Sequence, residues 1–198
     1  MLAMQQQFRQ QERRQAVDPR HLLASLRAHA TGLPNDDVFA SMLATWYSGG
    51  GALPRCLGLS DPQFGALLQR HFPGFVPPTR DDGDDLELER APERDDLLAL
   101  MVDNRAGNDP SEEWMAAIVV AGCMGNDHLW QDLGLWSRAE LTALMERNFP
   151  ALAARNDRNM KWKKFLYKQL CNAEGVYVCR APSCEVCADF DHCFGEER

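Results

Sequence analysis

The last part of the chain holds four cysteines within fifteen residues, and this spacing limits what the segment can fold into. They are Cys179, Cys184, Cys187 and Cys193, in the pattern C-x4-C-x2-C-x5-C. Disulfides between such near neighbours would close short loops and gain little loop-closure entropy. The chain shows no secretory signal, so we do not expect an oxidising compartment. The spacing therefore favours a metal centre with these thiolates as ligands.

The spacing also bears on which metal binds. Structural zinc usually takes two separated knuckles of the C-x2-4-C or H-x3-5-H type. Here one close pair, Cys184 and Cys187, is flanked by single cysteines at longer spacing, as in the contiguous loops of iron–sulfur proteins. A cubane cluster is wider than a zinc ion and needs longer spacers. We favour a sulfide cluster, such as [4Fe-4S], and a zinc site remains the alternative.

Composition excludes several classes of function. The chain has 198 residues and a net charge of −8, which argues against a nucleic-acid partner because phosphate binding requires a basic surface. No run approaches the ~20 apolar residues of a membrane span. Seven cysteines without a signal predict a reducing, cytoplasmic location. We interpret Cys56 and Cys123, which have apolar neighbours, as buried small hydrophobic residues.

Helix signals dominate the remainder of the chain, and strand signals are scarce. Residues 18–19, 35–37, 60–62 and 111–113 combine capping side chains with proline or acidic residues, followed by apolar residues at helical spacing. Ser137 begins an S-x-x-E capping box, and a last helix is expected at about 158–172. The predicted class is therefore all-α.

Two parts of the chain resemble each other. A leucine–leucine–alanine triplet, a leucine–glycine–leucine segment and the pattern A-L-[LM]-x-R-x-F-P recur at offsets of 75, 76 and 77 residues, respectively. We predict an internal duplication that gives two similar three-helix units packed in one core, followed by a C-terminal helix and an irregular cysteine-rich metal loop. The predicted divisions are a mobile arm (1–17), a helical domain (18–172) with repeats at 20–73 and 95–150 and an acidic linker at 75–93, and a cluster-binding tail (173–198).

The last predicted helix carries a basic face. Lys161, Lys164 and Lys168 follow helical spacing, and Lys163 lies nearby. A solvated face is one interpretation. The lysines could instead offset the negative charge of a thiolate-bound cluster, or attract an oxyanion such as molybdate or an acidic partner.

Three segments follow one another along the chain: residues 128–135 (HLWQDLGL), residues 160–171 (MKWKKFLYKQLC) and the cysteine motif. In this order they resemble the NifQ family, the molybdenum donors of nitrogen fixation. The resemblance extends from about residue 36 to residue 195. It implies that the four motif cysteines hold an iron–molybdenum–sulfur cluster, and that the protein supplies molybdenum for assembly of the nitrogenase iron–molybdenum cofactor.

The resemblance also implies partners and a class of function. The expected partners are a molybdenum source and the cofactor-assembly proteins, namely the NifEN scaffold and the NifH iron protein. It raises the standing of His128, which alone would be interpreted as a structural residue, to a candidate for holding molybdenum or oxo groups. No nucleophile–base motif or P-loop is visible, so we expect a carrier and not an enzyme. The alternatives are a helical interaction module with structural zinc and a simple electron-transfer iron–sulfur protein.

Overall fold

Helices account for all the regular structure in the part of the chain that is described. The computed structural model describes residues 18–78 and 93–174, and in these ranges it contains nine α-helices, one 3-10 helix and no strand. The all-α prediction is confirmed for these residues. The predicted arm (1–17), most of the acidic linker and all four motif cysteines lie outside them.

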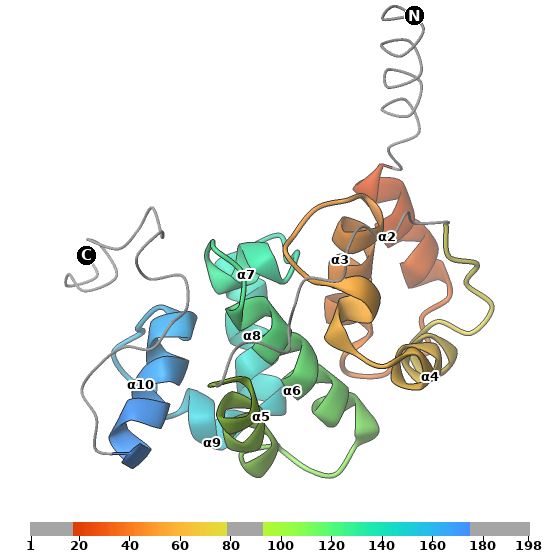
Figure 1. Cartoon of the computed structure of the whole chain (residues 1–198). Helices are drawn as coiled ribbons and strands as arrows, with labels where there is room; N and C mark the ends of the chain where they lie inside the picture. Colours follow the sequence, from red (N-terminus) through yellow and green to blue (C-terminus); the bar gives the residue numbers. More distant parts are fainter. Residues whose placement is uncertain (1–17, 79–92, 175–198) are drawn as a thin grey trace, which may run out of the picture.

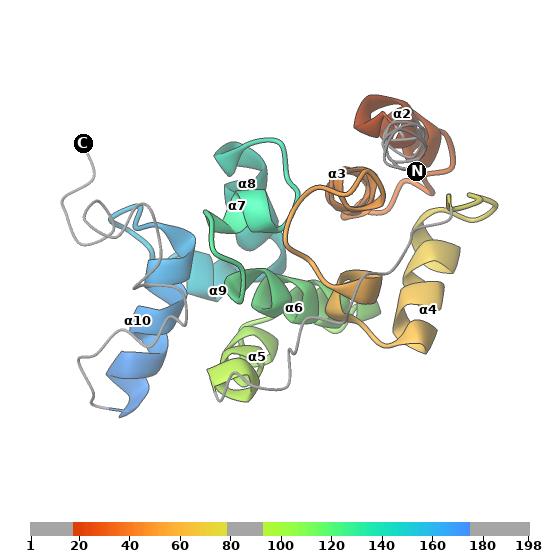
Figure 2. The same cartoon turned by 45° about the horizontal axis from the view of Figure 1, so that its top comes forward.

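The elements follow one another with short connections. In chain order they are α2 (Pro19–Ala28), α3 (Asp36–Tyr47), η2 (Arg55–Gly58), α4 (Asp61–His71), α5 (Glu93–Asp103), α6 (Pro110–Cys123), α7 (Leu129–Asp132), α8 (Arg138–Asn148), α9 (Pro150–Ala153) and α10 (Trp162–Glu174). Figures 1 and 2 show α2, α3 and α4 at one end of the molecule, α5 to α8 in the middle and α10 at the other end.

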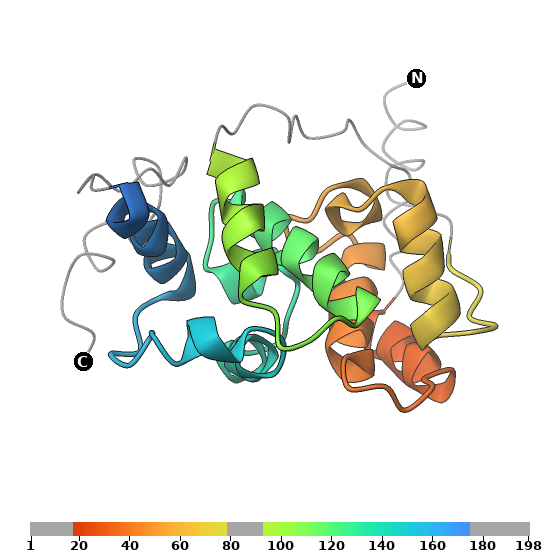
Figure 3. The ribbon, with the colours of Figure 1, turned by 90° about the horizontal axis from the view of Figure 1, so that it is seen from below.

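Two helices, α3 and α6, form the centre of the core. Nine of the twelve residues of α3 and ten of the fourteen residues of α6 are buried. A helix that is apolar on most of its circumference must be covered on several sides, and α6 is flanked by α5, α7, η2 and α4. Figure 3 shows α5 and α4 on either side of α6.

Most predicted helix starts agree with the structure. The Asp18 side chain accepts a hydrogen bond from the Arg20 N–H (2.9 Å), and Ser60 forms a capping box with Gln63 at the start of α4. The Ser137 hydroxyl accepts from the Glu140 N–H (3.2 Å), whereas the Glu140 carboxylate accepts from Trp136. The local capping signals therefore locate these helices well.

Two predicted starts were wrong, for local reasons. Helix α6 begins at Pro110 and is capped by Asp109, because the Asp109 side chain binds the Ser111 N–H (2.8 Å) and leaves Ser111 inside the helix. Helix α10 begins at Trp162 instead of residue 158. The Asn156 side chain binds both the N–H and the C=O of Met160 (2.8 and 3.0 Å), which closes a loop.

The order of elements repeats along the chain. The first helix of the second series starts 74 residues after the first helix of the first series (Glu93 and Pro19). The last helices of the two series start 77 residues apart (Arg138 and Asp61). Each series contains two helices, a short helical turn and a further helix. Each series thus has a fourth, short element, and the predicted division into two three-helix units of common origin stays a prediction.

Several contacts recur at the same offsets. Phe72 and Phe149 end α4 and α8 with nearly identical backbone angles (φ −138°, ψ 56° and φ −137°, ψ 55°). The carbonyls of His71 and Asn148 accept from Thr31 and Ala106 (3.2 and 2.8 Å), which occupy matching positions. These contacts are what two copies of one unit would make.

Candidate metal centre and the helix that carries it

The four motif cysteines lie outside the described residues, but the helix that leads to them is described. Helix α10 ends at Glu174, five residues before Cys179. Among residues 18–78 and 93–174, no group of three or more His, Cys, Asp or Glu side chains could hold a metal. The ligand set Cys179, Cys184, Cys187 and Cys193 stays a prediction.

Two cysteines in the core are poor candidates for ligands. Cys123 is buried in α6, and burial raises the pKa of its thiol to about 12, so the thiolate that binds metals is not formed. Cys56 is also buried, and its thiol donates to Asp61 (3.3 Å). Both are buried, as predicted.

Helix α10 docks through an apolar stripe. Trp162, Phe165, Leu166 and Tyr167 are buried, and Leu170 is partly buried against the same core. The helix packs against α5, and the Trp162 indole N–H donates to Thr142 of α8 (3.4 Å). This packing fixes the position of α10 on the core.

Lys163 makes a buried ion pair instead of joining a solvated face. Its ammonium group donates to the Asp132 carboxylate of α7 and to the Gly125 carbonyl (2.8 Å). The Lys163 side chain is 14% exposed and that of Asp132 is 2% exposed. Two of the three ammonium hydrogens are thus used inside the protein.

Asp132 is tied to its surroundings by further contacts. Its carboxylate accepts from the Asp127 N–H (3.1 Å), and its backbone carbonyl accepts from the Ala52 N–H (2.9 Å) in the first half of the chain. Burial raises the pKa of Asp132, while the hydrogen bond and charge of Lys163 act in the opposite direction. Sequence reasoning missed this residue, although it lies within the HLWQDLGL segment.

The other predicted basic residues differ in exposure. Lys168 is exposed, whereas Lys161 and Lys164 are half-buried. Lys161 precedes the first residue of α10, and its carbonyl accepts from the Phe165 N–H (2.9 Å). Their role toward a cluster, an oxyanion or a partner stays a prediction.

His128 is the residue immediately before α7. Its backbone N–H donates to the Gln131 side chain (3.3 Å), and it occupies the N-cap position of the short helix that ends with Asp132. His128 therefore caps α7, and Lys163 pairs with the last residue of the same four-residue helix. A part for His128 in holding molybdenum stays a prediction.

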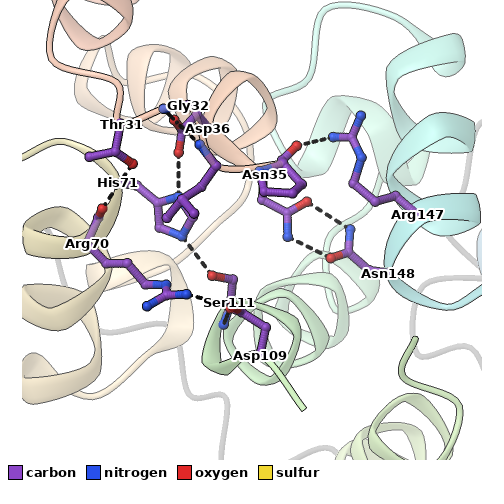
Figure 4. A network of polar contacts seen from close by, with 12 residues as sticks. Thr31, Gly32, Asn35, Asp36, Arg70, His71, Asp109, Ser111, Arg147 and Asn148 are labelled. Atoms are coloured by element: carbon purple, nitrogen blue, oxygen red, sulfur yellow. Dashed lines mark hydrogen bonds and ion pairs between the residues drawn. The ribbon is translucent and has the colours of Figure 1, made fainter. Parts of the chain in front are cut away.

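A second polar cluster lies between α3, α4 and α6 (Figure 4). The His71 Nδ1–H donates to Asp36 (2.6 Å), and the Ser111 hydroxyl donates to His71 Nε2 (2.8 Å). Beside it, Asn35 and Asn148 exchange side-chain hydrogen bonds (2.7 and 3.1 Å). Sequence reasoning missed both, because the partners are 35 to 113 residues apart.

This cluster has the residue types of a hydrolytic triad but not its exposure. His71 is fully buried, and Ser111 is 4% exposed. The second Asp36 oxygen accepts from the Gly32 and Leu33 N–H groups (2.7 and 2.9 Å), so the carboxylate is satisfied. Burial lowers the pKa of His71, with Asp36 opposing, which keeps the imidazole neutral. These residues join the two halves of the core.

Comparisons with known proteins relate most of the chain to one family. The family model described as NifQ matches residues 38–195. Protein NifQ of Azotobacter vinelandii is 48% identical over 156 residues, which are 73% of this chain and 80% of that protein. Protein NifQ of Rhodobacter capsulatus is 36% identical over 81% of this chain and 87% of its own length, and that of Klebsiella pneumoniae is 36% identical over 82% and 99%. No solved structure matches significantly.

Proposed function

This chain belongs to the NifQ family, and from that premise we propose that it is a molybdenum carrier for assembly of the nitrogenase iron–molybdenum cofactor. Its cargo is an iron–molybdenum–sulfur cluster, and Cys179, Cys184, Cys187 and Cys193 are the ligands.

One observation carries this proposal. The four-cysteine motif lies within residues 38–195, which the family model matches. The motif is therefore part of the region that the chain shares with the family. The donor set suits the cargo, because soft thiolates bind iron and sulfide-bridged clusters well. The core cysteines do not compete as ligands, since Cys56 and Cys123 are buried.

The described fold supports a carrier better than a catalyst. The Asp36–His71–Ser111 cluster has no solvent-accessible nucleophile and satisfies its own hydrogen bonds. Helix α10 packs on the core and ends at Glu174, five residues before the first motif cysteine. Within the described ranges, no helix is long and apolar enough to cross a membrane.

The remaining predicted residues have supporting parts in this proposal. Lys161, Lys164 and Lys168 partly neutralise the charge of a thiolate-bound cluster, or guide molybdate or an acidic partner toward it. His128, beside Asp132, holds molybdenum or its oxo groups during loading. The proposed recipients are the NifEN scaffold and the NifH iron protein.

The direct test is a transfer experiment. The protein is loaded without oxygen with iron, sulfide and isotopically enriched molybdenum, and is mixed with the NifEN scaffold and the NifH iron protein in an excess of unlabelled molybdate. We expect the label to move to the scaffold from the wild-type protein and not from a Cys187→Ala variant. Label that appears only as free molybdate, or an iron–sulfur centre that takes up no molybdenum, would contradict the proposal.

A further inference from the structure

The buried pair Lys163–Asp132 joins the start of α10 to α7, and its features point to a positioning role. We propose that this pair sets the register of α10 and thereby the position of its last residue, Glu174, which the cysteine segment follows in the sequence. The inference deepens the proposed function and rests on it for its meaning. Lys163 and Asp132 are positioning residues, which act on the cargo only through α10.

The packing around the pair shows that the site is built to hold it. A Cβ atom on Gly125 would lie 2.4 Å from the Asp132 Cγ atom, so only glycine lets the carboxylate take this place. The Gly125 carbonyl accepts from Lys163 (2.8 Å), and the Asp127 N–H donates to Asp132 (3.1 Å). Each charged atom therefore has a defined partner.

Such a pair is a poor means of adding stability. Taking two charges out of water opposes their attraction, and well-packed neutral residues of similar volume often stabilise a protein as well or better. In this pair, a displaced lysine would leave the Asp132 carboxylate, which is 2% exposed, with an unpaired charge in the core, so the pair favours one register. The pair is therefore best explained by the register of α10 that it fixes, and not by added stability.

The apolar stripe of α10 defines the register less sharply than the ion pair. Neighbouring residues Phe165, Leu166 and Tyr167 are all buried, so the stripe is broad. A slip by one residue rotates a helix by about 100° and moves it by about 1.5 Å. Lys163 is the second residue of α10, and the helix continues for about 17 Å beyond it toward the cysteine segment.

The pair also links α10 to the first half of the molecule. The Asp132 carbonyl accepts from the Ala52 N–H (2.9 Å), and a Cβ on Gly51 would lie 3.1 Å from the same carbonyl oxygen. The connection after α3 therefore contacts α7, and α7 contacts α10 through the ion pair. In this way the first half of the chain helps to hold α10 in place.

The test separates position from stability with three proteins. Lys163→Met alone leaves a buried carboxylate without its partner and lowers the melting temperature. The double variant Asp132→Asn/Lys163→Met keeps the shape of the carboxylate and removes both charges, so it regains most of the stability. The matched control is Asp37→Asn/Arg27→Met, the same change in an exposed ion pair between α3 and α2 (3.0 Å).

Two readouts decide the outcome. In the double variant we expect amide exchange along α10 to be about tenfold faster than in the wild type, with α5 and α8 unchanged, and molybdenum transfer to be about tenfold slower. The control should match the wild type in both. A double variant with wild-type exchange along α10 and wild-type transfer overturns the inference. If the wild-type protein takes up no molybdenum, the proposed function fails, and exchange along α10 still decides the positioning role.

Discussion

His71 is held between Asp36 and Ser111 in a neutral form, and this has a consequence for stability against pH. The groups that face it are Asp36 of α3, Asp109 at the N-cap of α6 and Arg70 of its own helix. Burial lowers its pKa below the usual value, so the unfolded chain binds a proton at a pH where the folded chain does not.

We therefore expect the free energy of unfolding to be unaffected by His71 above about pH 7 and to decline as pH falls below about 6.5, by at most about 1.4 kcal/mol per pH unit. Urea denaturation between pH 7.5 and 5 measures this slope. In a His71→Asn variant, which places there the residue found at the matching position 148, the slope should be smaller. Equal slopes in both proteins would show that His71 does not titrate in this range.

Gly125 offers a second test at the scale of one residue. A methyl group there would meet the Asp132 carboxylate at 2.4 Å, so Gly125→Ala should lower the free energy of unfolding by about 1–3 kcal/mol. The matched control is Gly65→Ala in the exposed part of α4, where no atom lies within 4 Å, and it should raise stability by about 0.4–1 kcal/mol. Two substitutions with the same sign would contradict the packing described around the ion pair.

The structural role of a residue could be predicted where the signal is local, and could not be predicted where the role depends on distant partners. The burial of Cys56 and Cys123 followed from their apolar neighbours. Asp132 and His71 could not be singled out, because their importance comes from Lys163, 31 residues away, and from Ser111, 40 residues away. Lys163 itself was noticed for its charge, but its partner inside the core was not.

At the scale of elements, capping chemistry located the starts of four of the nine α-helices in the described residues, namely α2, α3, α4 and α8. Asp18 and Ser60 precede helices as expected, since a polar cap followed by proline is a strong start signal. Helix α10 began four residues later than predicted, because the side chain of Asn156 competes with the helix for the Met160 backbone. Competition of this kind is not visible in apolar periodicity.

The basic residues of α10 give a prediction for this element. Replacing Lys161, Lys164 and Lys168 by Gln should reduce cluster loading or molybdenum transfer, and the loss should shrink at high salt because exposed charges are screened. Arg20→Gln/Arg27→Gln on α2, at the opposite end of the molecule in Figure 1, is the control. Metal content and the transfer rate at two salt concentrations are the measurements. Loading and transfer equal to the wild type would mean that these lysines form a solvated face.

For the whole molecule, the two halves are expected to unfold together. They share one core, and hydrogen bonds between Asn35 and Asn148 and between His71 and Ser111 cross between them. Calorimetry, circular dichroism and tryptophan fluorescence should therefore report one transition.

Asn148→Ala should lower the free energy of unfolding of that single transition by about 1–3 kcal/mol, because Asn35 is left without its buried partner. Two separate transitions, with only one sensitive to Asn148, would instead show two independent units. The recurring pattern was visible in the sequence, whereas the hydrogen bonds that join the two series of elements were not.

The central claim is that the motif cysteines bind a cluster that contains molybdenum. It is tested most directly by elemental and acid-labile sulfide analysis of protein purified without oxygen, with Cys187→Ala beside the wild type and Cys123→Ala as a control in the core. We predict iron, molybdenum and sulfide in the wild type and the control, and the loss of all three in Cys187→Ala with the helical content unchanged. Zinc without sulfide in the wild-type protein would contradict the account.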